Sequence, residues 1–299
     1  MNDVISNFDF YWHDNKKESN PQKKKYVRSA KYSPLGKLLT KINSRILAPY
    51  DKLLPGFIFG GVQGLNHKAA VAYLLGQKRK RVLLKVDISR FFEQIKDERV
   101  FDFFKHKCEC GVRGAKLLAS LCTVPIGPKN FPTSHIRTIA RGFATSPRLA
   151  IWCNLDTFIK LDRLIRTELR GKDPRIAIYV DDIGVTASRV SVEQMALLYK
   201  KIEKLLQEDR NQGLPLNAEK TRIIEHTGKT FDGNGVLITS EWGYEHLGAQ
   251  MKRNSLTIGK KTKAKLIDVT QKWERGEGGM LVKLRRKALL RHKRYMESA

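Results

Sequence analysis

The sequence predicts an α+β fold in which helices pack against an antiparallel sheet. Two short apolar runs, residues 176–180 and 183–187, are predicted to form the arms of a hairpin. A third apolar run, residues 81–87, has the composition of a buried strand. Residues 190–207 carry apolar side chains at helical spacing, which predicts an amphipathic helix packed on the sheet. These observations together favour a sheet covered by helices.

The remaining elements follow in chain order. Residues 1–25 join an aromatic patch to a polar stretch, which predicts an N-terminal arm and a flexible tether. Residues 35–53 and 68–75 show helix-like spacing. After Gly248, two basic helical stretches flank the glycine-rich residues 276–279. We therefore expect a helical C-terminal part that carries positive charge.

The charge balance predicts a polyanionic partner. The 299 residues include 57 Lys and Arg against 30 Asp and Glu, for a formal net charge of +27. Such a field favours nucleic acid, because neutralised phosphates release their counterions. A hydrophobic fraction of 41% allows a substantial core, and no apolar run is long enough to span a bilayer. The N-terminus lacks the pattern of a signal peptide, so we expect a cytoplasmic protein without a membrane partner.

Three aspartates stand where strands end. Asp87 closes the apolar run 81–87, and Asp181 and Asp182 are adjacent at the predicted hairpin tip. A tight hairpin turn favours glycine, so two carboxylates at the tip are a costly choice for stability alone. A divalent cation would explain them, since magnesium prefers carboxylate oxygens and lowers the repulsion between them. Two strands that deliver carboxylates to one point suit phosphoryl transfer with two metals, although a solvated turn is the alternative for the pair alone.

The order of five short motifs resembles that of reverse transcriptases. The motifs are residues 86–92 (Val-Asp-Ile-Ser-Arg-Phe-Phe), 141–147 (Arg-Gly-Phe-Ala-Thr-Ser-Pro), 179–182 (Tyr-Val-Asp-Asp), 213–221 (Gly-Leu-Pro-Leu-Asn-Ala-Glu-Lys-Thr) and 246–248 (His-Leu-Gly). Residues 28–34 are similar to the first fingers motif of bacterial retron enzymes. The resemblance implies a right-hand polymerase fold, with fingers and an antiparallel palm sheet over residues 26–245. Residues 1–25 would be an arm, and residues 246–299 a primer grip followed by a short, basic, helical thumb.

The resemblance also implies the catalytic roles. Asp87 and Asp181 would bind two Mg²⁺ ions, for which Mn²⁺ can substitute, and Asp182 would complete the acidic cluster. Lys220 would protonate the pyrophosphate leaving group, a role that lysine suits because it supplies both charge and a proton. A surface lysine is the alternative. Phe92 matches the steric gate that excludes a ribose 2′-hydroxyl, and a core phenylalanine is the alternative.

Further binding residues are expected from the same resemblance. The incoming nucleotide would contact one or two residues of the basic run, and the loop that opens the second motif; the candidates are Lys78, Arg79, Lys80, Arg81, Gly142, Thr145 and Ser146. The primer grip would consist of His246, Leu247 and Gly248. The thumb would hold nucleic acid through Lys283, Arg285, Arg286, Lys287, Arg291, Lys293 and Arg294. Arg141 stands where the family usually has glutamine.

The resemblance implies an RNA-directed DNA polymerase. Its partners would be an RNA template, in particular a dedicated noncoding RNA, together with deoxynucleoside triphosphates and a DNA product. An effector protein or a second copy of the chain could join them. The similar small bacterial enzymes belong to retrons and to defence-associated reverse transcriptases, so we expect a role in antiphage defence. An RNA-directed RNA polymerase and a noncatalytic RNA-binding subunit are the alternatives.

Overall fold

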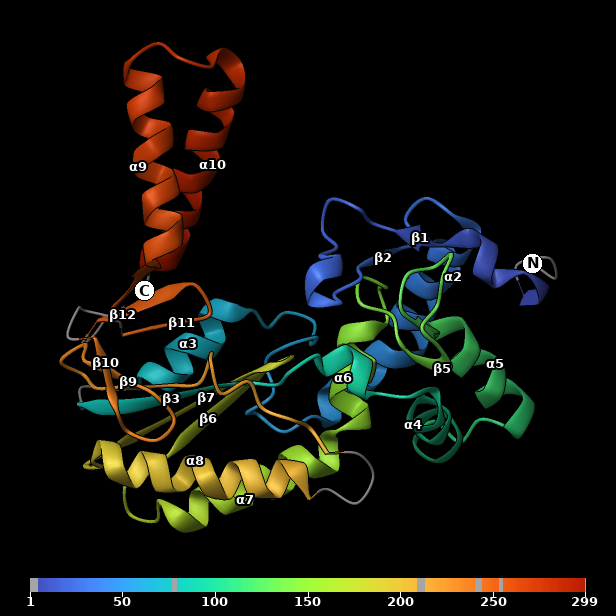
Figure 1. Ribbon diagram of the computed structural model, residues 1–299, viewed down its shortest axis with the longest axis horizontal. Helices are drawn as coiled ribbons and strands as arrows, with labels where there is room; N and C mark the ends of the chain where they lie inside the picture. The colour runs from blue at the N-terminus through green and yellow to red at the C-terminus, as the bar shows by residue number, and fades with distance from the viewer. Residues whose placement is uncertain (1–4, 77–79, 209–212, 240–243, 253–254, 299) are drawn as a thin grey trace. The chain divides into compact units, whose positions relative to one another are not determined.

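The computed structural model describes residues 5–76, 80–208, 213–239, 244–252 and 255–298. The chain forms two compact units (Figure 1). The first unit contains residues 1–65, 88–162 and 203–215, and the second contains residues 66–87, 163–202 and 216–299. No helix in the described part of the chain combines the length and the apolar composition needed to cross a membrane.

The second unit is built on a six-stranded sheet with the order β10-β9-β8-β3-β7-β6. Its strands are β3 (Arg81–Asp87), β6 (Arg175–Tyr179), β7 (Asp182–Ser188), β8 (Arg222–Ile224), β9 (Thr230–Phe231) and β10 (Leu237–Thr239). Every neighbouring pair is antiparallel. The predicted strand and hairpin are therefore present, and β3 lies in the interior of the sheet.

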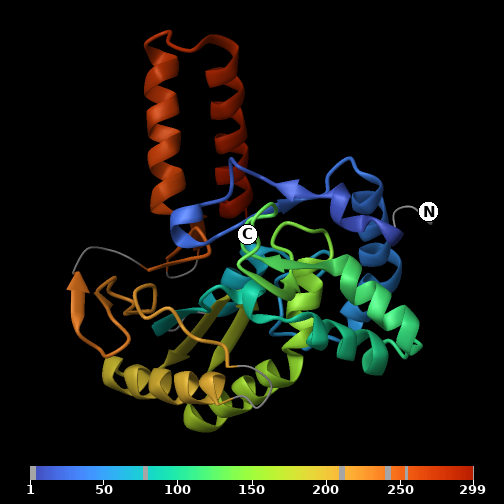
Figure 2. The ribbon, with the colours of Figure 1, turned by 45° about the vertical axis from the view of Figure 1, so that its right-hand side comes forward.

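Helices cover this sheet. Helix α8 (Val192–Gln207) lies along one face, as Figure 1 and Figure 2 both show. Met195, Leu198 and Ile202 of its predicted apolar stripe are buried. Helix α3 (His67–Leu75) begins after Asn66, whose side chain accepts a hydrogen bond from the Ala69 N–H, and it packs against β6. The predicted amphipathic helix thus supplies core to the sheet that carries the carboxylates.

A small sheet and two long helices complete the second unit. The strands are β11 (Glu245–His246), β12 (Ala249–Lys252) and β13 (Ser255–Ile258). Helices α9 (Lys260–Glu274) and α10 (Gly279–Glu297) follow and pack side by side as a pair (Figure 2). Gly276 and Gly278 adopt positive φ angles of 73° and 77° in the connection, which explains the glycines between the predicted basic helices.

The first unit is mainly helical. Its helices are η1 (Phe8–Tyr11), η2 (Pro21–Lys23), α2 (Pro34–Lys41), η3 (Ile42–Leu47), η4 (Ala48–Leu53), η5 (Phe91–Gln94), α4 (Asp97–Asp102), η6 (Phe103–Lys107), α5 (Val112–Cys122) and α6 (Ser146–Cys153). Helix α7 (Leu155–Glu168) begins in this unit and ends in the second. The predicted helix over residues 35–53 changes from α to π and then to 3₁₀ geometry. Pro49 lacks the N–H that a continued α-helix would need there.

The N-terminal arm is held within the first unit. Strand β1 (His13–Asp14) pairs with β2 (Arg28–Ser29), and the Arg28 guanidinium forms an ion pair with Asp14. Trp12 is buried, and the Lys129 ammonium lies 4.7 Å from the centre of its ring. Strands β4 (Thr123–Ile126) and β5 (Ser134–Ile139) form a separate antiparallel pair in this unit. The aromatic residue at the start of the chain therefore belongs to a packed arm.

Candidate active site

Asp87 and Asp182 face each other at one end of the central strand pair. The register of β3 and β7 makes these two residues direct partners. The Cβ atoms of directly opposed residues in an antiparallel pair are about 4.5 to 5.5 Å apart. Residues 81–87 pair with residues 182–188 over the whole length of both strands. The apolar pattern specifies this register, because a slip of one residue would turn every side chain to the opposite face of the sheet. The sheet thereby brings together two of the predicted carboxylates.

The hairpin tip is one residue earlier than the sequence predicted. Tyr179 and Asp182 are partners in the β6–β7 ladder, so the turn consists of Val180 and Asp181. Asp182 belongs to β7, because it pairs with Tyr179 on β6 and with Asp87 on β3. Val180 has a φ of 61°, an unusual conformation for a β-branched residue. Such backbone strain costs about 1 to 3 kcal/mol and is concentrated at functional sites.

Negative charge is crowded at this end of the sheet. The pKa of Asp182 is raised to about 6, first by burial and then by the charges of Asp181 and Asp87. Lys85 and Lys220 act in the opposite direction. Protonation is favoured when carboxylates are close together and short of positive charge, and a bound cation would reverse that preference. The electrostatics of Asp182 therefore fit a cation site.

Lys220 completes the cluster. Its Nζ donates hydrogen bonds to both carboxylate oxygens of Asp87, at 3.0 and 2.9 Å. The Asn217 N–H donates to the Asp87 carbonyl at 2.8 Å, and this bond ties the segment before Lys220 to the end of β3. The Lys220 side chain is 62% exposed, so a ligand can reach its ammonium group. The structure thus brings a predicted proton donor into contact with a predicted metal ligand.

Carboxylate oxygens are suitable donors for a hard divalent cation. Within the described residues, no group of three or more His, Cys, Asp or Glu side chains is arranged to hold a metal ion. Asp87 instead bonds to Lys220 in this structure. The donor chemistry and the raised pKa of Asp182 fit a divalent cation. Binding of such a cation would alter the contact between Lys220 and Asp87.

Sequence reasoning missed Lys85. This residue lies two positions before Asp87 on β3, so both side chains point to the same face of the sheet. Burial lowers the pKa of the Lys85 ammonium, whereas Glu245 and Asp182 raise it. A lysine inside an otherwise apolar strand, in phase with an aspartate at the strand end, is the signal that could have identified it. Lys85 supplies positive charge to the interior side of the cluster.

The segment predicted as a primer grip consists of the buried His246, the partly buried Leu247 and the exposed Gly248. His246 is 1% exposed, and a Cβ at Gly184 would lie 2.7 Å from its Nε2 atom. Burial lowers the pKa of His246 to about 3. Leu247 and Gly248 both have positive φ, as the two-residue turn between β11 and β12 requires. The His246 side chain packs on the sheet, and the turn is the part that a ligand can reach.

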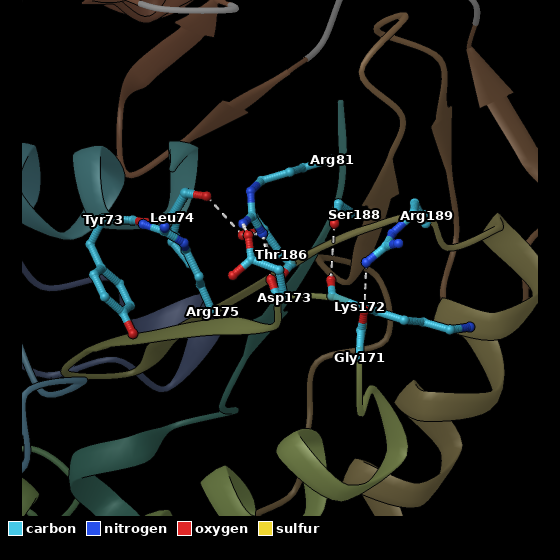
Figure 3. Close-up of polar contacts among 10 residues, drawn as sticks. All are labelled: Tyr73, Leu74, Arg81, Gly171, Lys172, Asp173, Arg175, Thr186, Ser188 and Arg189. Atoms are coloured by element: carbon cyan, nitrogen blue, oxygen red, sulfur yellow. Dashed lines mark hydrogen bonds and ion pairs between the residues drawn. The ribbon is translucent and has the colours of Figure 1, made fainter. Parts of the chain in front are cut away.

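The predicted basic run has different environments along its length. Lys78 and Arg79 lie outside the described residues, and Lys80 is exposed. Figure 3 shows that Arg81 contacts Asp173 and Thr186. Arg81 is 2% exposed and forms an ion pair with Asp173 at the end of β3 opposite to Asp87. Its guanidinium is thus used to hold the sheet and lies at the end of β3 away from the acidic cluster.

The other predicted nucleotide contacts lie in the first unit. Phe92 is 8% exposed and belongs to η5, directly after the fully buried Phe91. Gly142 has a φ of 103°, and a Cβ there would collide with the Arg28 carbonyl. Thr145 and Ser146 are buried, and the Ser146 hydroxyl donates to the Ala140 carbonyl at 2.6 Å. The Ser146 side chain therefore holds the loop itself, the Thr145 side chain is buried, and Gly142 has no side chain to block access to its backbone.

Most of the predicted thumb cations gather around one pocket. The pocket measures about 370 Å³ and lies between α9 and α10. It is lined by Trp273, Lys283, Arg286, Lys287, Leu290, Arg291 and Arg294. The Lys283 ammonium lies 5.8 Å from the centre of the Trp273 ring. Arg285 and Lys293 also lie on α10 but do not line this pocket. A pocket lined by one tryptophan and several cations has the chemistry of a phosphate-rich ligand site.

The sequence matches a known protein family and a curated relative. The family described as reverse transcriptase (RNA-dependent DNA polymerase) matches residues 16–253. Retron Ec48 reverse transcriptase of Escherichia coli is 26% identical over 211 residues, which cover 67% of this chain and 46% of that protein. The chain thus spans about half the length of this curated relative.

Two solved telomerase structures are among the matches. One is telomerase from Candida albicans in complex with a TWJ fragment of telomeric RNA, with a TM-score of 0.40 and 11% identity, covering 76% of this chain and 38% of that one. The other is apo telomerase from Candida tropicalis truncated from its C-terminal domain, with a TM-score of 0.43 and 13% identity, covering 75% of this chain and 45% of that one.

Proposed function

Because the chain belongs to the reverse transcriptase family, we propose that it is an RNA-directed DNA polymerase that adds deoxynucleotides to a primer on an RNA template. One observation carries the proposal. Asp87 and Asp182 are partners at the end of β3 and β7, and Lys220 bonds to Asp87 beside them. Nucleotidyl transfer needs this combination of acidic oxygens and a proton donor.

The aspartates are the proposed metal ligands. Asp87, Asp181 and Asp182 would hold two Mg²⁺ ions, which Mn²⁺ can replace. When bound, such ions activate the primer hydroxyl and stabilise charge on the triphosphate oxygens. The raised pKa of Asp182 supports this assignment, because burial and then the neighbouring charges of Asp181 and Asp87 disfavour its charged form, which a bound cation would favour.

Lys220 is the proposed general acid. Its Nζ would give a proton to the pyrophosphate oxygen that leaves as the new phosphodiester bond forms. In this structure the same Nζ donates to Asp87, which keeps the proton donor next to the acidic cluster. The charge of Lys85 lowers the pKa of Asp182, although burial lowers the pKa of Lys85 itself, and Lys85 is not a proton donor in the proposed reaction.

Nucleotide selection and nucleic-acid binding involve further residues. Phe92 is the proposed steric gate against the ribose 2′-hydroxyl, and Gly142 would let the backbone approach the nucleotide. Lys80 would contact the triphosphate. The turn at Leu247 and Gly248 would hold the primer end. The cations of α10 would grip the backbone of the template and product duplex, as the pocket beside Trp273 supports.

The template is proposed to be a dedicated noncoding RNA. The Escherichia coli relative is named as the reverse transcriptase of a retron, and it covers most of this chain. The net charge of +27 supports tight, salt-dependent binding of RNA. On this basis we propose a role in bacterial antiphage defence, either as a retron or as a related defence system.

The test compares nucleic acids bound by the wild type and by variants. Each protein would be purified with its native flanking locus, and the RNA and DNA that copurify would be sequenced. Asp181→Ala/Asp182→Ala should retain the RNA and lack complementary DNA, and Lys220→Ala should make at least tenfold less DNA. Glu208→Ala, an exposed carboxylate on a surface ion pair, is the matched control and should make wild-type amounts.

Two results would contradict the proposal. If the wild type holds RNA but no DNA, even after phage challenge, the protein is a noncatalytic RNA-binding subunit. If it makes RNA from the same template and Phe92→Ala leaves ribonucleotide use unchanged, it is an RNA-directed RNA polymerase. Complementary DNA in the wild type alone supports the reverse transcriptase proposal.

A further inference from the structure

Arg141 lies on the proposed steric gate. Its Cζ atom is 4.9 Å from the centre of the Phe92 ring, and its Nη2 atom donates to Glu93 Oε2 at 3.3 Å. Phe92 and Glu93 are neighbours in η5, so one guanidinium contacts two consecutive side chains. The same position is glutamine in the usual family motif. Glutamine has no positive charge to place over an aromatic ring.

The contact is largely shielded from water. The side chains of Arg141 and Glu93 are 20% and 15% exposed, and Phe92 is 8% exposed. Cation–π contacts and ion pairs are stronger under such conditions than on an open surface. The Phe91 ring lies 5.9 Å from the Phe92 ring and is fully buried. Phe92 is therefore held between a fixed core residue and a fixed cation.

A steric gate needs this kind of support. A ring can exclude a 2′-hydroxyl by bulk only if it cannot move aside at low cost. Removing the guanidinium would free both Phe92 and Glu93 to adopt other rotamers. Glu93 also faces the cation of Arg28, so its charge stays in place through more than one partner.

We propose that Arg141 is a positioning residue that fixes the Phe92 ring and thereby determines how strongly the enzyme prefers deoxyribonucleotides over ribonucleotides. The inference rests on the proposed polymerase function and on the role of Phe92 as the gate. The positive charge of Arg141 would thus serve sugar selection. Glutamine at this position, as in the family motif, would leave the Phe92 ring without a cation.

The test measures kcat/KM for dGTP and for GTP on one primed RNA template, for the wild type and for Arg141→Ala, Arg141→Gln and Arg141→Lys. Arg141→Ala should reduce the dGTP to GTP preference about tenfold, the effect of a desolvated cation–π contact of typical strength. Arg141→Gln should lose a similar amount. Arg141→Lys should recover part of it, because the ammonium restores charge without the planar fork. Glu93→Gln should cause a smaller loss.

A double-mutant cycle identifies the route of the effect. If Arg141 acts through Phe92, then adding Arg141→Ala to Phe92→Ala should leave the already reduced preference unchanged. Arg113→Gln, at an exposed arginine on α5, is the matched control and should keep the wild-type preference. Each variant's melting temperature would be measured, since a structural role alone would lower stability and both kcat/KM values together.

The outcomes separate this inference from the proposed function. A reduced preference in Phe92→Ala with an unchanged preference in Arg141→Ala overturns the inference alone. Additive losses in the double mutant also overturn it, because Arg141 would then act independently of the ring. Absence of DNA synthesis by the wild type overturns the polymerase proposal and the inference with it.

Discussion

The two ends of strand β3 place charges in opposite ways. At the Arg81 end, the buried guanidinium donates to Asp173 and to Thr186, so its charge is matched by acceptors (Figure 3). At the Asp87 end, the carboxylate faces Asp182, and the pKa of Asp182 is raised to about 6. The same strand therefore ends at Arg81 in a buried ion pair and at Asp87 in a crowded acidic cluster, in which Lys220 bonds to Asp87.

The two ends of β3 differ in whether their charges serve stability or chemistry. Charges that hold a fold are paired, because an isolated buried charge costs several kcal/mol. At sites for a substrate or metal, burial and neighbouring like charges are arranged so that pKa values are perturbed. Variants at the two ends should accordingly change different properties of the protein.

The largest expected effect is on activity at the Asp87 end. Asp87→Asn should reduce DNA synthesis at least about 10³-fold, because it removes a proposed metal ligand at the reacting centre. Its free energy of unfolding should stay within about 1 kcal/mol of wild type, since the lost partner is the exposed Lys220. Primer extension and urea unfolding would check both. Asp173→Asn is the control from the other end and should keep its activity.

The next effect is on stability at the Arg81 end. Arg81→Met should lower the free energy of unfolding by about 3 kcal/mol, because several buried hydrogen bonds and an ion pair are lost. Arg189→Met, at an exposed arginine that donates to the Gly171 carbonyl at 2.7 Å, should cost about 0.5 kcal/mol. Urea unfolding measures the difference. Equal losses in the two variants would show that Arg81 has no special structural role.

The third expected effect is on stability at low pH, and it comes from His246, which packs on the sheet between the two ends of β3. Its folded pKa is about 3, whereas an unfolded histidine titrates near 6.5. The unfolded chain thus binds more protons between pH 6.5 and 3, so stability falls as pH decreases through that window and is unaffected above it. From pH 7 to 5 this residue should cost about 2 kcal/mol.

His246→Leu should remove that loss, because leucine does not titrate. The measurement is the difference between wild type and variant in free energy of unfolding at pH 7 and at pH 5. An identical pH dependence in both proteins would show that folding does not lower the pKa of His246.

The smallest expected effect is at the strained turn. Val180→Gly should raise the free energy of unfolding by about 1 kcal/mol, because glycine adopts a positive φ without strain. DNA synthesis should fall, since the adjacent Asp181 becomes less rigidly placed. Val236→Gly, at an exposed valine, is the matched control and should not be stabilised. A destabilised Val180→Gly would mean that packing of the valine outweighs the backbone strain.

Much of the fold could be predicted from the sequence, because local pattern and motif order agree. The apolar runs around Asp87 and around Asp181 and Asp182 became neighbouring strands, and the family match confirms the α+β right-hand polymerase fold and the identification as a reverse transcriptase. The exact turn was wrong by one residue. Carboxylate position on a ladder depends on cross-strand register, which local propensity does not specify.

The environments of individual cations could not be predicted. Arg81 and Lys80 are consecutive in a basic run, yet one is buried in an ion pair and the other is exposed. Lys85 was hidden within an apolar strand, and its role depends on Glu245, which is distant in sequence. Contacts of this kind arise from tertiary packing, which a run of like charges does not reveal.

The bond between the Asn217 N–H and the Asp87 carbonyl joins main chain to main chain. The position of Lys220 is consequently inherited from the path of the backbone and does not require the Asn217 side chain. A second main-chain bond, from the Lys220 N–H to the Asn217 carbonyl at 3.1 Å, closes the turn that presents the lysine. Side-chain substitutions at residues 217–219 that keep the Asn217 N–H, proline at 217 excluded, should therefore still deliver the lysine to the same aspartate.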